Sequence, residues 1–287
     1  MTSASQLLKK KSSEDSSKSH QSFLLTEESS LIQKFLEKGI VRVPAEDKVA
    51  LDKIRDFLAD TAASWLQLPV QKDKGQFLDN IHNHIDVNKL NDFRMALINA
   101  MKQQSWLRPA YFSIARRAIE ILVGNELVMQ RNINLSIQLP NDDSSTLPVH
   151  SDVWSGDSPY EVVLWVPYVN CYGTKAMYYC DAKVDEKVQG NLEKFQNKSS
   201  EDLYNAIAKD APFIETNYGE VLLFTQNIMH GNRVNTETES RWSSNCRFKS
   251  ALSPYADKKL GEFFEPITLR PATRFGLRYK LPEGFES

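Results

Sequence analysis

Two histidines and an aspartate form the group of residues best suited to chemistry. His150 and Asp152 stand two positions apart in the segment Val149-His150-Ser151-Asp152-Val153-Trp154, and His230 follows after a long interval. Side chains two positions apart on an extended segment point to the same side, so His150 and Asp152 would converge on one point. A third ligand from a distant strand would complete a 2-His-1-carboxylate triad, which leaves three adjacent metal positions open and suits non-haem Fe(II).

A predicted strand after His230 carries polar residues that could bind a carboxylate. Arg241 and Ser243 share one face of the predicted strand 241–248, where a guanidinium can bind a carboxylate through two parallel hydrogen bonds and a hydroxyl can add a third. Asn245 and Arg247 lie on that same face, so Arg247 is a candidate for binding the substrate or, as an alternative to Arg241, the carboxylate. The opposite face is apolar enough to pack against helices and holds Trp242, Cys246 and Phe248.

Residues for a substrate pocket can be proposed from nearby polar and aromatic positions. The segment 132–139 alternates strictly between polar and apolar residues, which predicts a strand whose polar face would line a cavity in a barrel or meet solvent in an open sheet. Its polar positions are Asn132, Asn134, Ser136 and Gln138. Trp154 could wall the site, and Thr174 and Lys175, after a loop that contains Gly173, could contact a cosubstrate or substrate.

The sequence offers a second possible metal group at His82, His84 and Asp86. An H-x-H-x-D run also opens the zinc motif of metallo-β-lactamase-type hydrolases, where another histidine follows the aspartate directly. Here Val87 follows it. We therefore favour a solvated or locally hydrogen-bonded pair of histidines and keep a zinc hydrolase as an alternative.

The predicted secondary structure changes from helices to strands along the chain. Apolar residues recur at helical spacing in several stretches before residue 125, including about 88–101, whereas alternating or continuous apolar strands dominate after residue 130. Helices followed by strands predict a mainly β fold, an antiparallel barrel or sandwich buttressed by N-terminal helices. We expect a disordered tail at 1–25 and one domain at 26–287. Residues 26–128 would form the helical support and 129–287 the β core, with a polar, partly helical insertion at 181–210.

Composition limits the classes of partner. The 35 Lys and Arg residues nearly balance the 37 Asp and Glu residues, so no strongly basic field favours nucleic acid, and a small-molecule substrate is expected. No stretch has the roughly 20 continuous apolar residues of a membrane span. The three cysteines are odd in number and lack C-x-x-C spacing, which favours a reducing, cytoplasmic setting. The sequence leaves the oligomeric state open.

The order of these motifs closely resembles that of the Fe(II)/2-oxoglutarate-dependent oxygenases. In that superfamily a double-stranded β-helix, the cupin-like jelly roll, carries H-x-D, a distal histidine and then a basic residue about one strand later. The runs 150–159, 161–167 and 230–241 are similar to a bacterial group associated with sporadic carbohydrate-biosynthesis gene clusters. They are more distantly similar to the phytanoyl-CoA hydroxylase branch. The resemblance covers about residues 135–274.

The resemblance implies a jelly-roll core and a set of cofactors. His150, Asp152 and His230 would hold Fe(II), Arg241 and Ser243 would bind the distal carboxylate of 2-oxoglutarate, and O₂ would be the second cosubstrate. Because the carboxylate ligand is present, hydroxylation or another C–H oxidation is expected rather than halogenation, with release of succinate and CO₂. The substrate would be a small metabolite, such as a carbohydrate-pathway intermediate. The alternative is a non-catalytic jelly-roll module that binds carbohydrate or serves in assembly.

Overall fold

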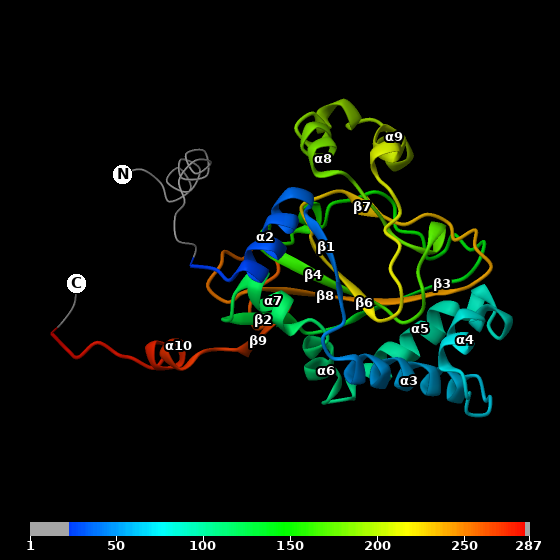
Figure 1. Ribbon diagram of the computed structural model, residues 1–287, viewed down its shortest axis with the longest axis horizontal. Coiled ribbons are helices and arrows are strands. Elements are labelled where there is room, and N and C mark those ends of the chain that lie inside the picture. Colours follow the sequence, from blue (N-terminus) through cyan, green and yellow to red (C-terminus); the bar gives the residue numbers. More distant parts are fainter. Residues whose placement is uncertain (1–22, 285–287) are drawn as a thin grey trace.

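The computed structural model describes residues 23–284, so most of the predicted N-terminal tail lies outside the described residues. The first half of the chain is mainly helical and the second half contains most of the strands (Figure 1). The helices are α2 (Thr26–Lys38), α3 (Lys48–Trp65), α4 (Lys74–Asp79), α5 (Val87–Lys102), α6 (Leu107–Ser113), α7 (Arg116–Val123), α8 (Ala182–Gln189), α9 (Ser200–Ile207) and α10 (Pro271–Gly276). The strands are β1 (Ile40–Pro44), β2 (Leu127–Gln130), β3 (Asn134–Gln138), β4 (Glu161–Pro167), β5 (Tyr178–Tyr179), β6 (Glu220–Thr225), β7 (His230–Gly231), β8 (Arg241–Ser250) and β9 (Phe264–Thr268).

The expectation of a mainly β protein is wrong, because the described helices hold more residues than the described strands. The structure is a mixture of helices and antiparallel sheet. Helices dominate before residue 125, and further helices, α8 and α9, lie between β5 and β6. The strands run from two residues in β5 and β7 to 10 in β8, whereas the supporting helices run to 18 residues in α3.

One seven-stranded sheet carries most of the β structure. Its strands follow the order β1-β6-β4-β8-β2-β9, and β3 pairs with β8 beside β2. All of these pairings are antiparallel. A second, two-stranded sheet joins β5 to β7, and an isolated bridge connects His150 to His230 at its edge. The second sheet therefore places both candidate histidines side by side.

Strand β8 separates the helical support from a polar interior. Trp242 contacts Phe93 of α5 and Phe248 contacts Phe112 of α6, each with ring centroids 5.9 Å apart. This confirms that the apolar face of the strand packs on N-terminal helices, which lie along one side of the sheet in Figure 1. The alternate positions from Arg241 to Arg247 consequently face the other way, because successive side chains of a strand point to opposite faces.

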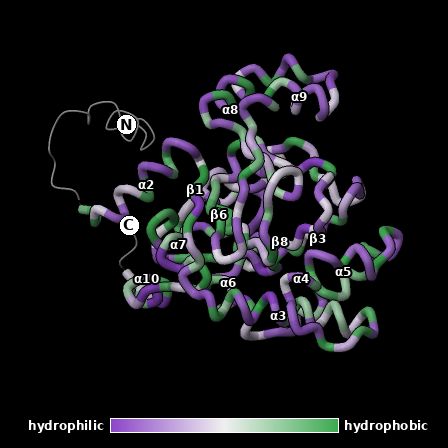
Figure 2. Tube along the Cα trace, turned by 45° about the vertical axis from the view of Figure 1, so that its right-hand side comes forward, coloured by the Kyte–Doolittle hydropathy of each residue, from purple (hydrophilic) through white to green (hydrophobic). Residues whose placement is uncertain are grey.

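The segment 181–210 forms α8 and α9 with short 3₁₀ turns between and after them. Figure 2 shows both helices projecting from the body of the fold, with hydrophilic residues along much of their length. Asp181 caps α8 and Ser199 caps α9 through hydrogen bonds to backbone amides, which explains where each helix begins. Among residues 23–284, no helix combines the length and apolar character needed to cross a membrane.

Candidate metal centre

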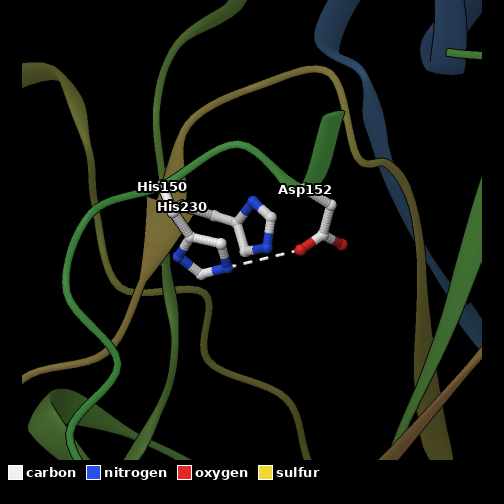
Figure 3. Close-up of side chains that lie close together, drawn as sticks. All are labelled: His150, Asp152 and His230. Carbon is white, nitrogen blue, oxygen red and sulfur yellow. Dashed lines mark ion pairs between the residues drawn. The ribbon is translucent and has the colours of Figure 1, made fainter. Parts of the chain in front are cut away.

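His150, Asp152 and His230 lie together although 80 residues separate the first from the last. One potential ligand atom from each falls within 4.8 Å of the others. The Nε2 atom of His150 is 3.4 Å from Oδ1 of Asp152, and the two imidazole centroids are 4.5 Å apart. Figure 3 shows the three side chains directed toward one another. The other described residues form no such group of three or more histidines, cysteines or carboxylates.

Backbone pairing sets the positions of these side chains. The amide of His150 donates to the carbonyl of His230 at 3.0 Å, and the amide of His230 donates back at 2.9 Å. The amide of Asp152 donates to the carbonyl of Gln226 at 3.1 Å. The sequence predicted that His150 and Asp152 point to the same side of an extended segment, and their contact agrees with that prediction.

Hydrogen bonds to backbone carbonyls select the tautomer of each histidine. Nδ1 of His150 lies 2.8 Å from the carbonyl oxygen of Pro148, and Nδ1 of His230 lies 2.9 Å from that of Ile228. A carbonyl can only accept, so Nδ1 carries the hydrogen in both rings. In the neutral form of each ring, Nε2 then carries the lone pair, which is the arrangement found in metal-binding histidines whose other nitrogen is fixed by a second partner.

The electrostatics of the group suit a divalent cation. Burial, helped by the nearby His150, lowers the pKa of His230 to about 4, so this imidazole is neutral at physiological pH. Burial would raise the pKa of Asp152, but the neighbouring His150, His230 and Arg247 together hold it well below its usual value. Two imidazoles and one carboxylate are a donor set that fits non-haem Fe(II).

Arg247 holds the second oxygen of the aspartate. Its Nη2 is 2.9 Å from Oδ2 of Asp152, and its Nε is 3.2 Å from Oδ1 of Asp157. Nε also donates to Oε1 of Gln226 at 2.9 Å. Lys258 forms a further ion pair with Asp157. Arg247 was a candidate for substrate or carboxylate binding, but two carboxylates of the protein already surround it.

Arg241 has the opposite environment on the same face of β8. Its side chain is 3% exposed, and Nη2 donates to the hydroxyl of Ser136 at 3.0 Å. Nε of Arg241 and the hydroxyl of Ser243 are buried and have no hydrogen-bond partner among the described residues. Burial lowers the pKa of the guanidinium, and no carboxylate pairs with it in the described part of the chain. Buried cations are normally paired, so this one is suited to an anionic ligand.

A cavity of about 360 Å³ connects these groups. Its lining includes the three members of the candidate triad, Arg241, Ser243 and Arg247. Asn134 and Ser136 from β3 also line it, in agreement with a polar strand face turned to a cavity. The amide of Asn134 donates to Oδ1 of Asn245 across the strand pair at 3.0 Å. The structure therefore brings most of the predicted site residues to one cavity.

Five of the residues proposed for the site do not line this cavity: Asn132, Gln138, Trp154, Thr174 and Lys175. Trp154 is 41% exposed, donates to Gln189 of α8 and lines a separate groove beside α9. Thr174 makes hydrogen bonds with the side chains of Thr236 and Glu237. Neither side chain is among the residues that line the cavity around the triad.

The alternative metal group is dispersed in the structure. Nδ1 of His82 lies 3.0 Å from the hydroxyl of Ser240, His84 is exposed beside Phe77, and Asp86 caps α5 through the amide of Asn88. Each residue thus has a local structural role. The geometry gives no support to a zinc site formed by these three side chains.

Sequence reasoning missed two charged residues of the site. Arg94 of α5 lines the cavity, and Asp157 contacts Arg247. Arg94 occurs in a helix whose periodicity marks only its buried stripe, so no sequence signal distinguished it. Asp157 lies five positions beyond Asp152 and could have been considered from its proximity to the motif.

Comparison with known proteins finds similarity among solved structures. No family model matches the sequence, and no curated protein does. The nickel complex of the non-haem monooxygenase ThoJ is 15% identical, with 83% of this chain and 84% of that chain covered and a TM-score of 0.52. Apo ThoJ is 13% identical, with the same coverage and a TM-score of 0.53. HygX from Streptomyces hygroscopicus, with nickel and 2-oxoglutarate bound, is 10% identical, with 85% and 98% covered and a TM-score of 0.49. The likeness to ThoJ confirms the predicted resemblance at the level of the fold: the chain has the fold of a non-haem oxygenase.

Proposed function

We propose that this chain is an Fe(II)- and 2-oxoglutarate-dependent oxygenase. The observation that carries the proposal is the presence of two complementary groups in one cavity. One group offers two imidazoles and a carboxylate within 4.8 Å of one another, and the other offers a buried guanidinium and hydroxyl with unused donors. A divalent metal fits the first group and a carboxylate fits the second.

The metal ligands would be His150, Asp152 and His230. His230 is neutral and Asp152 is ionised, so these two residues would bind a metal without a change of protonation state. Arg247 occupies Oδ2 of Asp152, which leaves Oδ1 directed toward His150. We infer that the aspartate would bind through Oδ1 alone, leaving positions of the metal open.

Arg241 and Ser243 would bind the distal carboxylate of 2-oxoglutarate. A guanidinium and carboxylate form two parallel charge-assisted hydrogen bonds, and the low polarity around a 3% exposed arginine strengthens them. Occupation of this site would also satisfy Nε of Arg241 and the hydroxyl of Ser243, whose burial without partners is unfavourable. Fe(II), 2-oxoglutarate and O₂ together would supply the oxidation of a substrate C–H bond, with succinate and CO₂ as coproducts.

The reaction and the fold can be proposed in more detail. We favour hydroxylation of a small metabolite, because Asp152 retains the ligand position that related halogenases leave to chloride. A carbohydrate-pathway intermediate is the substrate class suggested by the sequence motifs. Both antiparallel sheets contribute residues to the cavity, which is consistent with a double-stranded β-helix within a single domain, 26–287. Three free, buried cysteines suit a reducing, cytoplasmic setting.

Anaerobic titration tests the proposed centre without knowledge of the substrate. Protein loaded with Fe(II) should develop a weak visible charge-transfer band when 2-oxoglutarate is added, and admission of O₂ should yield succinate. Asp152→Ala should lose the band and most metal affinity. His84→Ala, which alters an exposed histidine, is the matched control and should behave as the wild type. A wild-type protein that binds Fe(II) but never shows the band would refute the proposal and favour a non-catalytic binding module.

A further inference from the structure

Arg94 is a cation of the cavity that the proposed chemistry does not use. It extends from α5, which packs against β3, and it is half-buried. Its Nη2 donates to Oδ1 of Asn91 on the same helix at 2.9 Å. No carboxylate within residues 23–284 pairs with it, in contrast to most arginines of the structure.

The charges of the cavity leave Arg94 without a counterion. Asp152 is the one acidic side chain among the described residues that line the cavity, and it already pairs with Arg247. Asp157 supplies Arg247 with a second carboxylate from outside the lining. The distal carboxylate of 2-oxoglutarate would neutralise Arg241. One positive charge, that of Arg94, therefore remains when the metal centre and cosubstrate site are both filled.

The polar strand face shows which end of the cavity is open. Along β3, Asn134 is exposed, Ser136 is partly buried and Gln138 is fully buried, opposite Arg241. The site proposed for 2-oxoglutarate is thus deep. Asn134 and its partner Asn245 are nearer to solvent, so a substrate would enter over them.

The wall between the two ends is apolar. Val163 and Trp165 of β4 and Phe224 of β6 all line the cavity. Val163 is paired with Phe224 in the sheet, and Phe224 contacts the ring of His230 with centroids 5.1 Å apart. A ligand in this space would have an uncharged or apolar body beside the candidate metal centre.

We propose that the substrate is a small metabolite that carries an oxyanion, a carboxylate or phosphate, which Arg94 binds while its uncharged part lies against Val163, Trp165 and Phe224. This inference rests on the proposed function. An arginine fork matches either oxyanion with two hydrogen bonds, which a neutral sugar cannot offer as a counterion. Because Arg94 is only half-buried, its contribution is smaller than that of a fully buried pair.

The test uses protein loaded with nickel(II) and 2-oxoglutarate, with loading measured first by calorimetry. Sulfate and methyl phosphate are then titrated as probes at constant ionic strength, with chloride as the balancing anion, to remove general screening. Wild-type protein should bind both probes, and Arg94→Gln should bind them about tenfold more weakly. Arg94→Lys should retain part of the affinity. Arg117→Gln, which alters an exposed arginine outside the cavity, should equal the wild type.

The outcomes separate this inference from the proposed function. Failure of the wild type to bind 2-oxoglutarate with nickel would count against the proposed function itself. Normal loading with no probe binding, or with equal binding by Arg94→Gln, would overturn the substrate class alone. A second measurement compares pairs of metabolites, each pair made of a neutral compound and the same compound carrying a phosphate or carboxylate. The anionic member of a pair should stimulate succinate release. Stimulation by the neutral members only would also overturn the inference.

Discussion

Arg241 and Arg247 lie on the same face of β8, six residues apart, yet their surroundings are opposite. Arg247 is held between Asp152 and Asp157 and also donates to Gln226. Arg241 is more deeply buried but has a single hydrogen bond, to Ser136, and no carboxylate. We infer that Arg247 would orient a proposed metal ligand, Asp152, whereas Arg241 would pair with an anion that the protein does not supply.

Replacement of Arg241, the arginine without a carboxylate partner, should have the largest effect on 2-oxoglutarate binding. Arg241→Gln should weaken 2-oxoglutarate binding by about 100-fold, because the cosubstrate carboxylate would be buried without a cation. Affinity for the metal alone should change little, since Arg241 does not contact the triad. Calorimetric titration of metal, then of 2-oxoglutarate, measures both quantities. Normal 2-oxoglutarate affinity in this variant would reverse the assignment of the two arginines.

Loss of the paired arginine should produce the complementary result. Arg247→Gln should weaken metal binding by about tenfold, because Asp152 would lose the partner that orients its second oxygen. The effect on 2-oxoglutarate, measured at saturating metal, should be small. A variant with intact metal affinity but impaired 2-oxoglutarate binding would show that Arg247, not Arg241, anchors the cosubstrate.

A smaller effect is expected at the neighbouring hydroxyl. Ser243→Ala should weaken 2-oxoglutarate binding about fivefold, the effect of one hydrogen bond. Ser244, the next residue, provides the control because its hydroxyl lies 2.6 Å from that of Tyr168 on the other face of the strand. Ser244→Ala should leave 2-oxoglutarate affinity unchanged. Equal losses in the two variants would indicate a general disturbance of β8 instead of a direct contact.

The smallest effect is expected on stability, from the buried carboxyl group of Glu161, which accepts a hydrogen bond from Gln226. Burial raises the pKa of Glu161 to about 6, helped by the negative charge of Asp157. The unfolded chain therefore loses this proton first, and the free energy of unfolding should fall as pH rises from about 4.5 to about 6. Glu161→Gln removes this contribution, so the wild-type minus variant difference should fall over that window and then level off. A difference that is flat with pH would place Glu161 in a normal environment.

The sequence predicted the residues whose positions depend on local geometry. His150 and Asp152 are two positions apart and share a side, and the two faces of β8 separate as the period-2 pattern requires. Both signals depend only on the conformation of a few consecutive residues. The link to His230 came from the order of motifs, and the structure brings the three candidate ligands together.

The site residues that the sequence placed wrongly or missed depend on turns and on packing between distant elements. The chain leaves the extended conformation at Asp152 and enters a 3₁₀ turn, Asp152–Ser155, so Trp154 does not continue the face of His150. Thr174 lies in another 3₁₀ turn and is bound to the loop at 236–237. Arg94 reaches the cavity only because α5 packs on β3. The excess of helix likewise comes from the supporting elements, which the strand motifs do not describe.

The most direct measurement is a crystal structure of the protein with nickel(II) and 2-oxoglutarate bound under anaerobic conditions. We expect the metal to be bonded to Nε2 of His150, Nε2 of His230 and Oδ1 of Asp152. The distal carboxylate of 2-oxoglutarate should lie on Arg241 and the hydroxyl of Ser243. A metal bound at His82 and His84, or a carboxylate bound to Arg247 with Arg241 left unpaired, would contradict the proposed centre.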